Sequence, residues 1–225
     1  MKPSPGTLGR AAALCISAMV LAACSSTPPP PDWQMNARAS LERAQKAALT
    51  GLTSIEAAEM ARVRRELART GRADLMARAE LALCATRVAA LDFSACEAFE
   101  ALAADAAENE RAYARYLQGR PWAGDAVWLP EVQRPLAAGG DAARQALAAV
   151  PDPLSRLVAA GVLMRRGDAS PEVIAQAVET ASAQGWSRPL LAWLGVQRDR
   201  ARAAGDQAQA ERLQRRMELI LRPPR

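Results

Sequence analysis

Glycines recur in this chain at intervals of about one helix length. Gly51 and Gly71 are twenty residues apart, and Gly167, Gly185 and Gly205 are separated by eighteen and twenty residues. Glycine is typical of the position just past a helix, because it adopts the left-handed backbone conformation without the steric cost of a Cβ atom. Helices that end at this interval predict antiparallel hairpins of about 38 residues, close to the repeat lengths of helical repeat proteins.

The composition favours helix over sheet. Half of the 225 residues are apolar, but only 4% are aromatic, and alanine is far commoner than the β-branched residues. Alanine has the strongest helix propensity, whereas strands are enriched in β-branched and aromatic residues. The sequence therefore predicts an all-α fold of antiparallel helical hairpins, arranged as a solenoid or as an irregular helical bundle.

Capping residues mark where several helices begin. Asp32 is a candidate cap for the first helix, and Asp152 and Ser170 each precede a proline, which is well tolerated in a first helical turn. Asp206 with Gln209 is similar to a capping box. The expected helices cover residues 32–49, 53–71, 72–91, 94–117 with a break near residue 105, 131–138, 142–149, 152–167, 170–185, 187–205 and 206 to the C-terminus.

The last hairpin, Pro189 to Arg222, resembles a degenerate tetratricopeptide unit. A small-residue turn at Ala204-Gly205-Asp206 is followed by Ala210 four residues later, although the usual aromatic positions are missing. The resemblance covers one or two hairpins. It implies stacked hairpins with an extended concave surface suited to peptides or protein partners.

The N-terminal residues have the order of an export signal. Lys2 and Arg10 precede an apolar run of 13 residues from Ala11 to Ala23, too short to span the roughly 30 Å core of a bilayer. With its end at Leu21-Ala22-Ala23-Cys24, the run resembles the lipobox of bacterial lipoproteins. The resemblance implies that the Cys24 thiol carries a diacylglycerol, that the signal is cut before Cys24 and that the new amine is acylated. An ordinary secretory signal and an uncleaved apolar helix are the alternatives.

The residue after the cysteine indicates which of the two bacterial membranes holds the protein. Lipoproteins kept at the inner membrane often carry Asp there, so Ser25 implies the inner leaflet of the outer membrane, with the folded part in the periplasm. Trp33 then lies at the lipid headgroups or packs on the first helix. The expected segments are a signal peptide at 1–23, a lipidated cysteine and Pro-rich tether at 24–32, helical hairpins at 33–118, a Trp-containing connection at 119–130 and further hairpins at 131–225, the last three forming one continuous domain.

Charge is unevenly distributed along the chain. Without the signal, 27 basic and 24 acidic residues leave a net charge of +3, which gives no reason to expect a nucleic-acid partner. Residues 92–110 contain six acids and no base, whereas residues 186–225 contain nine arginines and four acids. The basic end predicts contact with anionic lipid or peptidoglycan carboxylates, or is an ordinary solvated helix face. Its candidate contact residues are Arg212, Arg215 and Arg216.

Two of the four cysteines remain for the folded part. Cys15 leaves with the predicted signal and Cys24 is the predicted lipid site, so Cys84 and Cys96 form an even pair in an exported chain, which predicts a disulfide. The alternative is that both stay reduced as small buried apolar residues. Two thiols without any histidine are a poor zinc site, so no metal is expected.

The sequence offers little support for catalysis. The absence of histidine excludes Ser-His-Asp and Cys-His arrangements, and neither a GxSxG elbow nor a Walker A phosphate loop occurs. Carboxylates suffice for glycan cleavage, but the acids of residues 92–110 are expected on a solvated helix face. No catalytic residue and no cofactor is predicted. The clustered acids are Glu97, Glu100, Asp105, Glu108 and Glu110.

The longest stretch without a helical pattern in the folded part runs from Arg120 to Pro130 and carries Trp122 and Trp128. Aromatic side chains on a connection between hairpins form a hot spot for a partner chain or a glycan. The alternative is that both indoles fill the junction between the two halves of the domain. Trp122 and Trp128 are therefore candidate partner contacts.

These features together predict a lipid-anchored periplasmic protein that acts as a non-enzymatic interaction or scaffold module at the cell envelope, with a protein partner. The alternative is a peptidoglycan-associated enzyme or enzyme activator that uses a carboxylate. A third reading is the binding of a small apolar ligand between hairpins.

Overall fold

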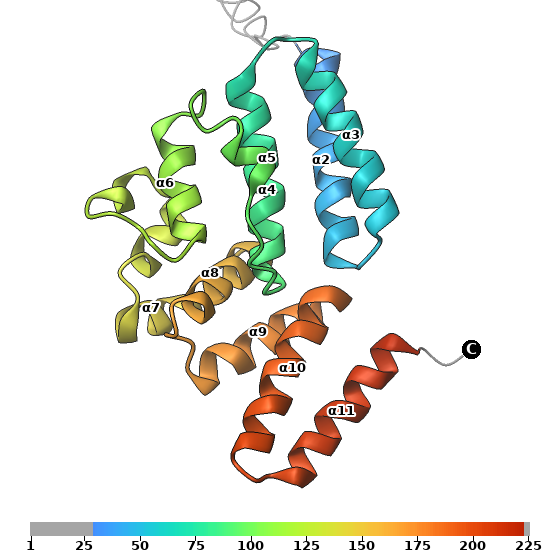
Figure 1. Cartoon of the computed structure of the whole chain (residues 1–225), viewed down its shortest axis with the longest axis vertical. Coiled ribbons are helices and arrows are strands. Elements are labelled where there is room, and N and C mark those ends of the chain that lie inside the picture. The colour runs from blue at the N-terminus through green and yellow to red at the C-terminus, as the bar shows by residue number, and fades with distance from the viewer. Residues whose placement is uncertain (1–28, 223–225) are drawn as a thin grey trace, which may run out of the picture. The chain divides into compact units, whose positions relative to one another are not determined.

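Capping residues at the helix N-termini and glycines after the helix C-termini divide the folded part of the chain into short helices. The computed structural model describes residues 29–222 (Figure 1), so the predicted lipobox Leu21-Ala22-Ala23-Cys24 lies outside the described residues. Within residues 29–222 every regular element is helical, and the predicted all-α fold is confirmed. The elements are α2 (Asp32–Leu49), α3 (Thr53–Ala68), α4 (Ala73–Ala89), α5 (Glu97–Glu100), α6 (Glu108–Leu117), the 3-10 helices η2 (Asp125–Trp128) and η3 (Glu131–Leu136), α7 (Gly140–Leu147), α8 (Pro153–Arg165), α9 (Pro171–Ala183), α10 (Ser187–Ala203) and α11 (Gln207–Leu221).

Three predicted N-caps form their hydrogen bonds. The carboxylate of Asp152 accepts from the backbone N–H of Ser155 at 2.7 Å, and the side chains of Ser170 and Asp206 accept from the N–H three residues on, at 3.4 and 2.9 Å. At the opposite ends, the five regularly spaced glycines have φ angles between 65° and 80°. These local conformations explain why the helices begin and end close to the predicted residues.

The structure differs from the expected helices mainly between residues 90 and 150. The helix expected over 94–117 is split into α5 and α6 by turns that occupy 101–106, so the break near residue 105 is wider than expected. The helix expected over 131–138 is the 3-10 helix η3, since Pro135 has no N–H for an α-helical bond. Asp32 lies in the first turn of α2 and does not precede it.

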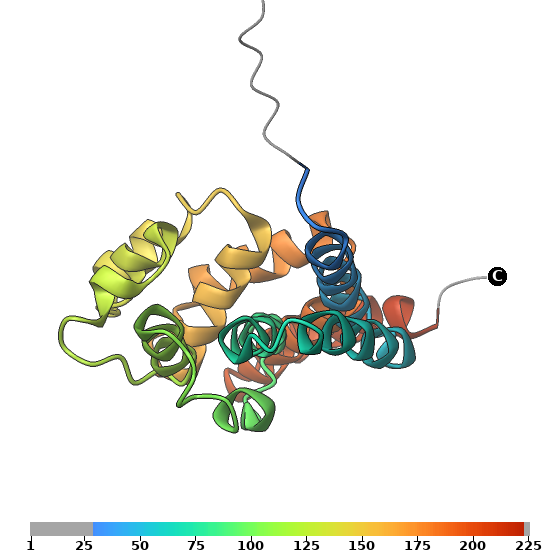
Figure 2. The ribbon, with the colours of Figure 1, turned by 90° about the horizontal axis from the view of Figure 1, so that it is seen from above.

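Consecutive helices pack as antiparallel hairpins. α2 lies along α3, and α10 lies along α11, with α9 also in contact with α10 (Figure 1). Seen from above, α8 lies between the α2–α3 hairpin and the segment from η2 to α7 (Figure 2). The predicted hairpin architecture is therefore confirmed.

The core consists of two apolar clusters that share α4. The smaller cluster lies between α2, α3 and α4 and includes Met60, Val63 and Leu83. Trp33 packs against this cluster, which agrees with the prediction that it packs on the first helix and not with the prediction that it lies at the lipid headgroups. The larger cluster extends from α4 through α6 and α8 to α10. α4 therefore buries apolar side chains on both sides, which requires a helix that is apolar around most of its circumference.

Helices far apart in the sequence also contact one another. α4 packs on α8, and α10 packs on α2. The indole of Trp193 in α10 is fully buried, and its Nε1–H donates to the carbonyl of Ala89 at 3.0 Å. In a simple solenoid each repeat contacts only its neighbours, so these contacts favour an irregular bundle over a solenoid.

The two hairpin regions expected at 33–118 and 131–225 share the larger cluster. The described residues from Asp32 onward accordingly form one unit by their contacts. Among the described helices, none combines the length and the apolar character that a membrane crossing requires.

The crossing of α4 and α8 depends on Gly161, where a Cβ atom would collide with the backbone carbonyl oxygen of Val88. We expect Gly161→Ala to lower the free energy of unfolding by about 1–3 kcal/mol, the usual cost of overpacking. Urea unfolding followed by circular dichroism measures the change. Gly195→Ala is the matched control, because a Cβ atom there meets nothing within 4 Å and a helical alanine is favoured over glycine by about 1 kcal/mol. Equal effects of the two substitutions would contradict this packing.

Candidate functional site

Three large apolar side chains are exposed between residues 122 and 128, which we call the Trp turn. Trp122, Val127 and Trp128 retain 69%, 68% and 51% of their accessible surface. The interpretation that the two indoles fill the junction between the halves is therefore wrong. Leu129 and Leu136 lie in the core at this point of the chain, each 1% exposed.

A buried carboxylate holds the Trp turn in place. The chain reverses at Gly124, whose φ of 92° is strained for a residue with a side chain, and Asp125 follows. Asp125 is 4% exposed and accepts hydrogen bonds from Arg115 Nε at 2.9 Å, from Arg115 Nη2 at 2.6 Å and from the backbone N–H of Trp122 at 2.8 Å. A bidentate pair of this kind fixes orientation as well as distance.

Arg115 connects α6 to the Trp turn through further contacts. It donates to Glu108 at 2.8 Å, and its guanidinium carbon lies over the Trp122 ring, 4.1 Å from the ring centroid. Hydrogen bonds from Arg115 hold the pKa values of Asp125 and Glu108 below their usual range, so both carboxylates are ionised at neutral pH. The guanidinium of Arg115 therefore forms a cation–π contact with one face of the exposed Trp122 indole and restricts its orientation.

A groove of about 450 Å³ borders the Trp turn at Trp128. This volume lies within the range of small-molecule sites. The polar lining comes from Arg78, Asn109 and Glu110, and the apolar lining from Leu81, Ala82, Tyr113, Trp128, Leu129 and Pro130.

Glu110 is the buried member of the acidic segment. Its Oε1 accepts from Arg78 Nε at 2.7 Å and from Asn109 Nδ2 at 3.2 Å, whereas its buried Oε2 has no hydrogen-bond partner among the described residues. The predicted exposure of the acids on a helix is confirmed for Glu97 and Glu100 on α5; Asp105 is exposed but lies in the turns between α5 and α6, and Glu108 is half-buried. The prediction is wrong for Glu110, because α6 packs on α4 and turns this residue toward Arg78.

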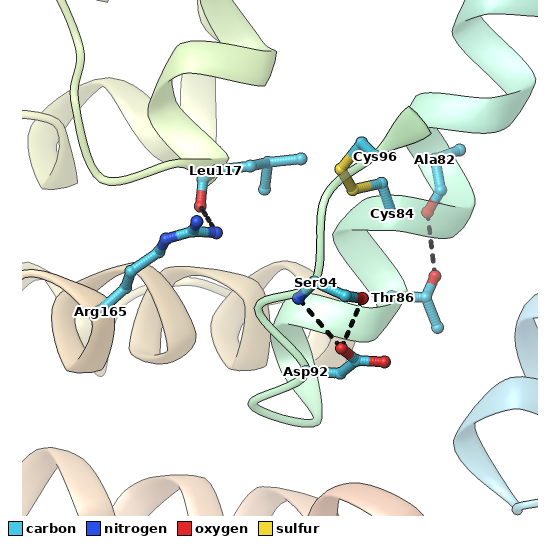
Figure 3. The surroundings of a disulfide bond; sticks show 8 residues. All are labelled: Ala82, Cys84, Thr86, Asp92, Ser94, Cys96, Leu117 and Arg165. Atoms are coloured by element: carbon cyan, nitrogen blue, oxygen red, sulfur yellow. Dashed lines mark hydrogen bonds between the residues drawn. A yellow bond between two sulfur atoms is a disulfide. The ribbon is translucent and has the colours of Figure 1, made fainter. Parts of the chain in front are cut away.

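Cys84 and Cys96 lie at disulfide distance, as the cysteine pattern predicts. Their Cα atoms are 6.0 Å apart, and Figure 3 shows the two sulfur atoms bonded. The turn between them is closed by Asp92, whose Oδ1 accepts from the backbone N–H and the hydroxyl of Ser94 at 3.1 and 2.7 Å. The bridge therefore ties the segment before α5 to the side of α4.

Loss of the bridge is expected to lower the free energy of unfolding by about 3 kcal/mol, since a closed loop of this size restricts the unfolded chain. Urea unfolding of Cys84→Ala/Cys96→Ala, with and without reductant, measures the loss. Reductant should lower the stability of the wild type to that of the double variant and leave the double variant unchanged. A wild type that is insensitive to reductant would contradict the pairing.

The arginine candidates lie on the last helix. Arg212, Arg215 and Arg216 are exposed on α11, and Arg212 donates to the Gln209 side chain at 2.9 and 2.7 Å. Figures 1 and 2 show α6 and α11 on opposite sides of the bundle. The structure therefore does not bring these arginines together with the Trp turn.

The sequence singled out the two indoles but not the residues that position them. Arg115 and Asp125 belong to a chain in which charged residues are common, and no local pattern distinguishes them. The available signal was Gly124-Asp125, a pair of turn-forming residues between two tryptophans.

No protein-family model, no curated protein and no solved structure matches the chain. The function is therefore argued from the geometry of the Trp turn and its surroundings.

Proposed function

We propose that the protein is a lipid-anchored module of the bacterial cell envelope, facing the periplasm, that binds a protein partner through the Trp turn and has no enzymatic activity. The observation that carries the proposal is the exposure of Trp122, Val127 and Trp128 on a turn that Asp125 and Arg115 hold in place.

The physical properties of the Trp turn suit a binding surface. Tryptophan is enriched among the residues that dominate binding energy, and apolar surface gains free energy when a partner removes it from water. A turn that is already fixed loses little conformational freedom on binding, so more of that gain appears as affinity. The predicted absence of catalytic groups agrees with a binding role.

Variants of the Trp turn test the proposal through recovery of a crosslinked partner. Wild type should recover one defined envelope protein after periplasmic crosslinking, and Trp122→Ala/Trp128→Ala should lose it. Leu219→Ala/Leu221→Ala is the matched control, because both side chains are exposed, apolar and located on α11. Recovery of the same protein with the Trp variant would contradict the proposal. Recovery of cell-wall fragments alone would favour the alternative of a peptidoglycan-associated enzyme or activator.

Cys24 supplies the membrane attachment in this proposal. Each buried CH₂ of an acyl chain contributes about 0.8 kcal/mol, and stable anchoring takes more than one chain, which diacylglycerol with an acylated amine provides. The seven residues from Ser25 to Pro31 include four prolines, and a polyproline II segment of this length would span about 20 Å.

Cys24→Ala is expected to lose the lipid and to move from the detergent phase to the aqueous phase in a Triton X-114 partition. Cys15→Ala is the matched control, since Cys15 belongs to the predicted signal and should leave partitioning unchanged. Mass spectrometry of the mature chain measures the lipid directly. A Cys24→Ala protein that still partitions with detergent would rule out the anchor.

A further inference from the structure

The groove beside the Trp turn combines an apolar floor with a small set of polar groups. Its lining is mostly apolar, and the polar groups come from Arg78 on α4 and from Asn109 and Glu110 on α6. Ligand sites typically have this composition, in which a few polar groups orient a ligand that apolar side chains cover.

Glu110 lines this groove and has an unused hydrogen-bond acceptor, its buried Oε2. Oε1 is occupied by Arg78 and Asn109, but the buried Oε2 has no donor among the described residues. A buried carboxylate oxygen without a hydrogen-bond donor is rare in folded proteins. Such an oxygen usually accepts a hydrogen bond from solvent or from a ligand. Oε2 is buried, so a donor from the groove reaches it only when the carboxylate turns about its soft terminal torsion and readjusts its bonds to Arg78 and Asn109.

The charge around Glu110 favours a neutral hydrogen-bond donor over a cationic one. Arg78 already forms an ion pair with Glu110 at 2.7 Å, so a second cation would meet the repulsion of the guanidinium. A neutral O–H or N–H group meets no such repulsion. Arg78 uses only its Nε in this pair and its side chain is 62% exposed, so its two terminal nitrogens face water and are available as donors.

The aromatic residues of the lining indicate what kind of ring system the ligand has. Two aromatic residues line the groove, Trp128 from the Trp turn and Tyr113 from α6. A pyranose ring has a C–H face that packs on an aromatic ring and carries hydroxyl groups on its edge. These hydroxyls donate to a carboxylate and accept from arginine or an amide. A purely apolar ligand would leave Oε2 of Glu110 without a donor.

We propose that this groove binds a neutral saccharide, with the sugar ring on Trp128, a sugar hydroxyl donating to Glu110 Oε2, and Arg78 and Asn109 donating to sugar oxygens. We assign binding and not cleavage to this groove, because most glycoside hydrolases use two carboxylates and Glu110 is the one acid among the described residues that line it. The site goes beyond the partner-binding function of the Trp turn, since Trp122 and Val127 do not line it.

Titration calorimetry of the detergent-solubilised full chain with β-1,4-linked tetrasaccharides tests the proposal. N-acetylglucosamine and glucose tetramers are the two probes, and a stronger response to the first would indicate a cell-wall source of the sugar. Glu110→Gln and Trp128→Ala should each weaken binding about tenfold or more, because each removes a main contact. Glu97→Gln, at an exposed acid of the same segment, is the matched control and should bind as the wild type does.

Two further variants keep the test informative. Trp128→Phe retains an aromatic face and should restore most of the affinity, and Asn109→Ala replaces Glu110→Gln if that variant does not fold by circular dichroism. No binding of either tetrasaccharide by wild type, equal binding by Trp128→Ala, or tighter binding of a tetralysine peptide would each overturn the proposal. None of these results depends on the protein partner of the Trp turn.

Discussion

Replacement of Trp193 by alanine is expected to lower the free energy of unfolding by about 3–5 kcal/mol. Trp193 is the largest side chain among those that the described fold buries completely, and it lies in the larger cluster, where its indole reaches Ala89 at the end of α4. Its loss leaves a cavity and also leaves the carbonyl of Ala89 without its indole donor. Urea unfolding followed by circular dichroism measures the change.

Two comparisons separate the causes of this effect. Trp193→Phe keeps most of the apolar volume but removes the indole N–H, so it should cost about 1–3 kcal/mol. Val127→Ala changes an exposed apolar residue and should alter stability by less than about 0.5 kcal/mol. A Trp193→Ala variant as stable as Val127→Ala would show that the Trp193 indole is not buried against the end of α4 as described.

Asp125→Ala is expected to have the second large effect, a loss of up to about 3–5 kcal/mol, because it removes the bidentate and more deeply buried partner of Arg115 and leaves this mostly buried guanidinium only the partly exposed carboxylate of Glu108. The Trp turn also loses the acceptor of the Trp122 N–H. We therefore expect faster proteolysis at the Trp turn and weaker recovery of the protein partner. Unfolding by urea and limited proteolysis measure the two effects, and Asp105→Ala, at an exposed acid, is the control for both.

The effect of Asp125 should depend on pH in a defined direction. Hydrogen bonds from Arg115 lower its pKa in the folded protein, so the carboxylate contributes its full stabilisation above the unfolded pKa of about 3.9. That contribution is lost as the pH falls through the lowered folded pKa. The stability difference between wild type and Asp125→Ala should therefore be constant near neutral pH and should shrink below about pH 4. A difference that does not change with pH would contradict the ion pair.

Local signals in the sequence were sufficient to predict most helices. A glycine that must adopt a positive φ, or an Asp or Ser that accepts from an N–H three residues on, acts within one turn of the chain. Gly167, Asp152 and Ser170 therefore act as predicted. The prediction was less accurate at α5 and η3. Pro135 determines the backbone conformation of η3, and the packing of neighbouring helices determines that of α5.

The candidate site could be predicted only in part because its geometry depends on distant residues. The exposure of Trp122 and Trp128 follows from Leu129, Leu136 and Tyr116, which occupy the core near the Trp turn. Composition alone favours burial of an indole, so the sequence left both alternatives open. The position of Glu110 likewise depends on Arg78, thirty-two residues earlier in the chain.

Site-specific photo-crosslinking from position 127 in living cells tests the central claim most directly. A photoreactive phenylalanine derivative in place of Val127 should give one discrete adduct with an envelope protein, because this side chain is exposed and belongs to the same turn as Trp122 and Trp128. The same derivative in place of Leu219, which is exposed on α11, should not give that adduct. No adduct from position 127, or the same adduct from both positions, would contradict a partner-binding role for the Trp turn.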